Sequence, residues 1–308
     1  MEKLISVIST ALPVFLALAM GMMCRSKGFL TRDGVDTLKK VIVNLTLPFV
    51  LFNSFATADY SLSSLILPVI IFVICTIMLA LGYGWVKVTG SGSKVAPFLA
   101  SGVEAGMLGF SLFGLLFPDE SMSRFAMLVL GQEIFVFTLY KMLLTGKTSP
   151  KAIINDFLTS PTLIAVVLGL IVGASGLYGA FRSWGVNTII ESVTSFISAP
   201  TGTIILFAVG FDLVLKEINW KKTGNMVAMR LVIAGLMLSL LILLNRTVLN
   251  GMIFEGAAVM LFMLPSPYII PIFADAAEER VQISSALSAL TLITMILFAV
   301  CSVVVGIM

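Results

Sequence analysis

The sequence has little charge and no histidine. Only 11% of its 308 residues are charged, whereas 59% are hydrophobic and the mean hydropathy is +1.10. Soluble globular domains carry about 25% charged residues, so this composition excludes a water-soluble enzyme. The missing histidine excludes Ser-His-Asp and Cys-His catalytic sites and histidine-based metal sites. Cys24, Cys75 and Cys301 lie far apart in or beside apolar runs, which predicts buried thiols rather than a metal motif or a disulfide framework.

Ten apolar stretches are long enough to cross a bilayer as helices, which takes about 20 residues each. They cover residues 4–24, 35–56, 65–88, 95–117, 125–145, 161–179, 187–211, 226–244, 254–274 and 283–306, here called spans one to ten. The longest polar connection, 146–160, lies at the midpoint of the chain. The first stretch runs past a signal-like Ala17-Leu18-Ala19 as far as Arg25, which predicts an uncleaved helix. The sequence therefore predicts an all-α integral membrane protein with ten transmembrane helices.

The basic residues are distributed unequally between alternate loops. One side carries 15 of the 19 lysines and arginines: Arg25, Lys27, Arg32, Lys39, Lys40, Lys87, Lys94, Lys141, Lys147, Lys151, Lys216, Lys221, Lys222, Arg230 and Arg280. The other side carries 4: Lys3, Arg124, Arg182 and Arg246. Cytoplasmic loops are enriched in Lys and Arg. We therefore expect a multi-pass protein of the cell (inner or plasma) membrane with both termini outside the cytoplasm and the 146–160 loop inside.

The two halves of the chain, 1–150 and 151–308, share features at corresponding positions. Eight residues separate Pro13 from Gly21 in span one and Pro161 from Gly169 in span six. Because each half contains five spans, the second copy must enter the membrane from the opposite face. The sequence therefore predicts two inverted five-helix repeats that form one transmembrane domain, an architecture typical of secondary transporters.

Spans four and nine are each interrupted at mid-length. Residues 102–109 contain three glycines, and residues 264–268 read Leu-Pro-Ser-Pro-Tyr. Single kinks of this kind often serve packing alone, but paired interruptions in both halves predict two broken helices that cross at the membrane midplane.

Polar and helix-breaking residues of five spans lie at the depth of this crossing. We predict that the substrate or ion site is formed by Asn44, Pro48, Glu104, Gly106, Gly109, Gln132, Glu133, Pro200, Thr201, Pro265, Ser266 and Pro267. Half-helix N-termini attract anions, and unwound carbonyls suit a cation such as Na⁺. We predict no catalytic residue, bound metal or organic cofactor.

Glu104 is the most informative of these residues, because a carboxylate in hydrocarbon costs about 2.5–3.5 kcal/mol and must face a protein or water-lined interior. Alternatives remain for three residues. Glu104 could be a protonated group hydrogen-bonded to a neighbouring helix, Glu133 could bond only to Gln132, and Asn44 could cap backbone groups freed by Pro48.

Several segments resemble the auxin efflux carrier family, which includes the plant PIN carriers and bacterial malate and malonate permeases. The resemblance covers nearly the whole chain. It rests on Leu12-Pro13-Val14-Phe15-Leu16, Gly21, Arg25, Gly28-Phe29-Leu30, Gly34-Val35, Asn44-Leu45-Thr46-Leu47-Pro48, Ala199-Pro200 with Gly210, and Leu264-Pro265 with Ala274. At the break of span four, Glu104 and Ser111 stand where the family has Asn and Pro, so a titratable group occupies a site position.

The resemblance implies ten helices in inverted repeats and transport of organic anions. It also implies that spans one, two, six and seven form a scaffold and a possible homodimer interface, against which the other spans move. No nucleotide-binding GxxxxGK[ST] motif is present. We therefore expect a secondary active transporter that moves a small mono- or dicarboxylate by alternating access, coupled to H⁺ or Na⁺.

Three other functions remain as alternatives: a sodium-coupled symporter of the bile-acid type, an anion channel or facilitator, and an intramembrane enzyme. Apart from the organic anion, the expected partner is the lipid bilayer, and no nucleic acid is expected.

Overall fold

The computed structural model describes residues 2–61, 64–90, 93–146, 158–213, 220–268, 270 and 277–307. Within these residues every regular element is a helix, which confirms the all-α class. Side chains at the outer surface are largely apolar, as at Phe196, which is 84% exposed, and Leu236, which is 58% exposed. Apolar patches of this extent mark a surface that faces lipid or partners rather than water. Most of the predicted central loop, 147–157, lies outside the described residues.

The helices of the first half are often interrupted. They are α1 (Glu2–Ser26), α2 (Arg32–Val41), η1 (Ile42–Thr46), α3 (Leu47–Ala56), α4 (Ile66–Thr89), η2 (Ala96–Ala100), η3 (Ala105–Gly109), α5 (Phe110–Leu116), α6 (Met122–Phe135), η4 (Val136–Tyr140) and α7 (Lys141–Thr145). The elements η1, η3 and η4 are π-helical turns and η2 is a 3₁₀-helix. Single π turns inside longer helices are frequent at functional sites.

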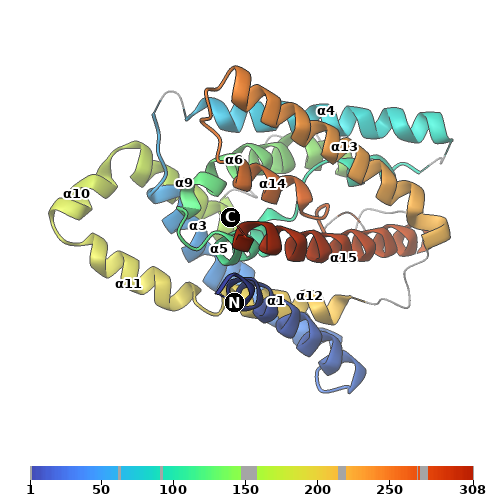
Figure 1. Ribbon diagram of the computed structural model, residues 1–308, viewed down its shortest axis with the longest axis horizontal. Coiled ribbons are helices and arrows are strands. Elements are labelled where there is room, and N and C mark those ends of the chain that lie inside the picture. Colours follow the sequence, from blue (N-terminus) through green and yellow to red (C-terminus); the bar gives the residue numbers. More distant parts are fainter. Residues whose placement is uncertain are drawn as a thin grey trace.

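The second half contains longer helices. They are α9 (Pro161–Ala174), α10 (Leu177–Ser183), α11 (Asn187–Ser198), α12 (Thr201–Asp212), α13 (Trp220–Thr247), α14 (Glu255–Met263) and α15 (Ala277–Ile307). Figure 1 shows α4 and α15 running in nearly the same direction across the molecule and α13 oblique to them, with the turn between α10 and α11 at one end.

Five stretches have the length and composition of membrane spans: Ile66–Thr89, Met122–Thr145, Asn187–Asp212, Thr223–Thr247 and Glu279–Gly306. They correspond to predicted spans three, five, seven, eight and ten. A sixth, span six, is a pair of helices, α9 and α10, bent by 71°. Spans two and four are divided into shorter helices, and in the described part of span nine α14 ends at Met263. The total of ten spans stays a prediction.

Glycines let two pairs of helices approach closely. A Cβ on Gly21 of α1 would lie 2.0 Å from the carbonyl oxygen of Phe207 in α12, and one on Gly210 would lie 2.2 Å from Leu18 O in α1. In the same way, a Cβ on Gly169 of α9 would lie 2.8 Å from Phe52 O in α3. Small residues at such crossings allow the close packing that holds membrane helices together. Span one therefore packs on span seven, and span six packs on span two.

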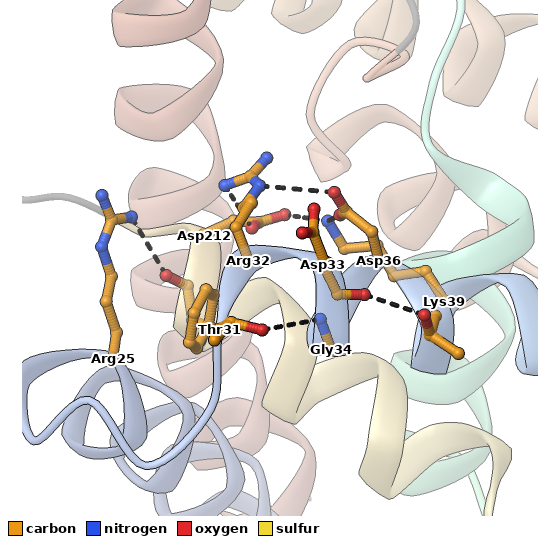
Figure 2. A network of polar contacts seen from close by, with 10 residues as sticks. Arg25, Thr31, Arg32, Asp33, Gly34, Asp36, Lys39 and Asp212 are labelled. Atoms are coloured by element: carbon orange, nitrogen blue, oxygen red, sulfur yellow. Dashed lines mark hydrogen bonds and ion pairs between the residues drawn. The ribbon is translucent and has the colours of Figure 1, made fainter.

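A polar network joins α2 to the end of α12 (Figure 2). Asp212 pairs with Arg32, at 2.9 Å, and with Lys39. The carboxylate lies at the C-terminal end of α12, where the helix dipole disfavours a negative charge, so the two cations compensate it. Arg25 at the end of α1 donates to Phe211 O over 3.2 Å. The ends of α1, α2 and α12 are thereby held together.

Candidate functional site

The breaks in spans four and nine are adjacent in space. In span four the chain is extended at Ser101 and takes a positive φ of 69° at Gly102 before η3 begins. In span nine α14 ends at Met263, and Leu264 is extended with ψ 149°. A Cβ on Gly102 would lie 3.0 Å from Cγ of Pro267, so glycine suits both the backbone conformation and the close approach. The predicted interruptions of both spans are confirmed.

Glu104 connects the two breaks through its backbone and its side chain. Its N–H donates to Pro265 O at 2.9 Å, and its Oε2 accepts from the N–H of Tyr268 at 3.0 Å. Ser266, which is fully buried, donates from its hydroxyl to Leu99 O at 2.6 Å. A change of charge or position at the Glu104 carboxyl group therefore acts on both broken helices at once.

Side chains of neighbouring helices satisfy the carbonyl groups that the breaks release. Gln132 of α6 donates to Val103 O at 2.9 Å, and Thr294 of α15 donates to Met263 O at 2.6 Å. Arg230 of α13 donates to Ala100 O at 3.0 Å and to Leu264 O at 3.1 Å. Tyr140 also donates to Phe98 O, at 3.0 Å, beside the Ser101 N–H that this carbonyl already accepts. Unpaired backbone groups are costly away from water, so these bonds stabilise the unwound segments.

A cavity of about 340 Å³ lies beside the crossing. Its polar lining comes from Glu104, Gln132, Glu133, Lys141 and Thr162, and most of the remaining wall is apolar. Buried Gln132 directs its amide nitrogen to Val103 O, while its Oε1 has no hydrogen-bond partner within the described chain. The volume lies in the range of small-molecule sites, and a few polar groups among apolar ones are typical of them.

A second cavity, of about 430 Å³, lies between α3, α5, α11 and α12. It contains Asn53, Ser111 and Glu191 together with Met122, the first residue of α6, whereas the first cavity contains Lys141 near the opposite end of the Met122–Thr145 span. The two cavities therefore approach the centre of the molecule from opposite ends.

A third cavity, of about 560 Å³, lies between α1, α12 and α15. It is lined by Arg25, Arg32, Asp212 and Arg280 and extends to Tyr268 beside the crossing.

The structure brings most of the predicted site residues together. Glu104, Gly106, Gln132, Glu133 and Pro267 line the first cavity. Pro265 and Ser266 form the break of span nine. Gly109 lies just beyond, where a Cβ would be 2.9 Å from Leu264 Cδ1, so it serves the packing of the two broken helices.

Four predicted residues lie elsewhere. Asn44 is exposed and donates to Lys40 O at 2.8 Å, and Pro48 follows the π turn η1 near the start of α3. Pro200 is exposed at the turn between α11 and α12, and Thr201 lines the second cavity and donates to Thr46 Oγ1 at 2.8 Å. Asn44 lies inside the π turn η1, where the wider backbone turn changes the angle between successive side chains, so position along a regular helix did not predict its direction.

The expectation that Arg230 lies in a cytoplasmic loop is wrong. The residue lies inside α13 and is only 1% exposed, so the bias in basic residues becomes 14 to 4. The signal was present, because an arginine four residues inside a predicted apolar span is a functional candidate in a membrane helix. Lys141 and Tyr268 were also missed as site residues, and no pattern in the sequence pointed to the backbone N–H of Tyr268.

Two comparisons with known proteins are consistent with this geometry. Residues 6–157 match the family described as "Membrane transport protein". An uncharacterized transporter from Methanothermobacter thermautotrophicus is 25% identical over 308 residues, covering 96% of this chain and 97% of that protein. The similarity thus extends past residue 157 into the second half of the chain.

Proposed function

We propose that the chain belongs to the membrane transport protein family and is a secondary active transporter for a small organic anion, such as a mono- or dicarboxylate, that works by alternating access. The observation that carries this proposal is the position of Glu104. Its carboxyl group lines the 340 Å³ cavity and bonds to the second broken helix. Occupation of the cavity can therefore act directly on the crossing.

The cavity offers several groups to a carboxylic acid. Lys141 supplies a cation, and η3 begins directly after Glu104, so its first N–H groups lie beside the cavity wall. Gln132 Oε1 needs a donor, which the hydroxyl of a protonated carboxyl group would supply. A purely apolar substrate would leave this buried oxygen unsatisfied, at a cost of about 1–3 kcal/mol.

The coupling ion in this proposal is a proton. Glu104 and Glu133 line one cavity, and two ionised carboxylates would repel an anionic substrate. Protonation of Glu104 removes its share of that repulsion, so proton and substrate should bind together and each should raise the affinity for the other by the same factor.

The packing of the glycine-containing helices supports the proposal of two inverted repeats, 1–150 and 151–308. An exchange of the repeats converts span one into span six and span seven into span two. The contact of Gly21 with α12 then becomes the contact of Gly169 with α3, which is the contact observed. The two cavities that approach from opposite ends are what alternating access requires.

The test is uptake of radiolabelled carboxylates into proteoliposomes, with pH and Na⁺ gradients imposed separately. We expect saturable uptake of at least one carboxylate, counterflow against preloaded substrate, and accumulation driven by the pH gradient. Glu120→Gln is a matched control, because this loop carboxylate pairs with Arg124 at 3.1 Å and lies outside all three cavities. Flux without saturation or counterflow would indicate a channel, and accumulation driven by Na⁺ alone would indicate a sodium symporter; both contradict the proposal.

A further inference from the structure

Arg230 is a buried cation at the crossing that the transport proposal does not yet use. It is 1% exposed, and its two terminal nitrogens donate to Ala100 O and Leu264 O at 3.0 and 3.1 Å. In the described part of the chain it forms no ion pair with a carboxylate; backbone carbonyls compensate its charge. An arginine remains charged in proteins, so this cation is permanent.

The two carbonyls that bind Arg230 both lie at the C-terminal end of a broken helix. Ala100 is the last residue of η2, and Leu264 directly follows the end of α14, so both lie where a broken helix ends. Such ends present unpaired carbonyl oxygens with partial negative charge. In transporters with broken helices, these ends coordinate the coupling Na⁺, while the N-terminal ends face an anionic substrate.

We propose that the guanidinium group of Arg230 is a resident cation that occupies the position of a coupling metal ion, so that the crossing binds no Na⁺ and offers only its anion-binding side to a ligand. This inference rests on the proposed function. Other released carbonyls also have protein donors, namely Leu99 O from Ser266, Val103 O from Gln132 and Met263 O from Thr294. The hydrogen-bond donors of the protein thus occupy the carbonyl oxygens that would otherwise bind a cation, and Arg230 supplies the positive charge.

The fork of the guanidinium group explains why arginine suits this position. Two nitrogens of one rigid plane bind carbonyls that lie 130 and 34 residues away along the chain and thereby join the two breaks. A lysine would keep the charge but supply a single ammonium group without the planar fork. Arg230 is therefore a positioning residue whose charge and shape both matter.

Chemical rescue tests this inference without a known substrate. We would measure the Tm of the purified protein and of Arg230→Ala and Arg230→Lys in NaCl and in choline chloride, with millimolar guanidinium or urea added. Arg230 borders a cavity of about 200 Å³ through which a small molecule can reach the vacated position. Urea has nearly the shape and the N–H groups of guanidinium but no charge. Arg246→Ala is the control, because its side chain is 67% exposed and pairs with Glu255.

We expect the wild type to have the same Tm in NaCl and choline chloride. Arg230→Ala should lose several degrees of Tm, guanidinium should restore most of that loss, and urea should not; Arg246→Ala should respond to neither. Equal rescue by urea, no rescue by guanidinium, or stabilisation of the wild type by Na⁺ would each overturn the proposal.

If Arg230→Ala does not fold, Arg230→Lys and the wild-type salt comparison decide. Arg230→Lys should be less stable than the wild type and more stable in detergent than Arg230→Met, which has no charge, and equal loss in the two variants would contradict the charge requirement. These readouts need no transport. A protein that moves no carboxylate would refute the proposed function and leave the result on Arg230 intact.

Discussion

The close crossing of α1 and α12 allows the loss of stability caused by a larger side chain to be predicted. A Cβ on Gly21 would lie 2.0 Å from Phe207 O, whereas ordinary contact begins at 3.4 Å, so the two helices would have to separate by 3.4 − 2.0 = 1.4 Å at this point. A gap of even 0.5–1 Å loses about a quarter to a half of each dispersion contact that spans it. Forced overpacking of this kind costs about 1–3 kcal/mol, and a backbone neighbour cannot rotate away.

Gly21→Ala should therefore lower the Tm of the purified protein by several degrees, as measured by thermal unfolding in detergent. Gly169→Ala should do so less strongly, because its nearest neighbour, Phe52 O, is at 2.8 Å. The matched control is Gly235→Ala in the exposed interior of α13, where a Cβ meets nothing within 4 Å and helix propensity favours alanine by about 0.5–1 kcal/mol. A Gly21→Ala protein as stable as the wild type would refute the packing argument, and so would equal losses in all three variants.

Two further predictions concern the breaks and the orientation. Pro265→Ala should lower transport more than expression, because alanine favours regular helix at the buried break by up to about 3 kcal/mol. Pro200→Ala, at an exposed turn, should lower transport less, as measured by uptake normalised to the amount of protein in the membrane. Normal uptake by Pro265→Ala would show that the break serves packing alone. A cysteine in place of exposed Ser183 should react with an impermeant maleimide added outside the cell, and one in place of exposed Ser26 should not, in a background without native cysteines. The reverse labelling would contradict the orientation expected from the lysine and arginine bias.

The sequence predicted the membrane class, the resemblance to a transport family and the two breaks because each depends on local information. The length of each apolar stretch indicates a membrane span. The glycines within 102–109 and the prolines at 265 and 267 interrupt the helices in which they occur. The family resemblance drawn from such motifs is confirmed by the match over residues 6–157.

Long-range contacts account for what the sequence did not predict. The position of Arg230 inside span eight marks it as a candidate, but its partners lie 130 and 34 residues away along the chain, and no local pattern identifies them. Asn44 lies at a suitable position along span two, yet it falls within the π turn η1, and its amide donates to Lys40 O of the same span. Depth along a helix is visible in the sequence, whereas facing direction depends on the packing.

In the proposed function, Glu104 couples the binding of a carboxylate to the binding of a proton at the crossing. The most direct test compares the wild type with Glu104→Gln in proteoliposomes, for a carboxylate that the wild type transports. The amide keeps an oxygen that can accept from the Tyr268 N–H but cannot titrate. Glu104→Gln should exchange substrate across the membrane without a gradient and should fail to accumulate it when a pH gradient is imposed. Accumulation by Glu104→Gln with the same response to pH as the wild type would contradict the account.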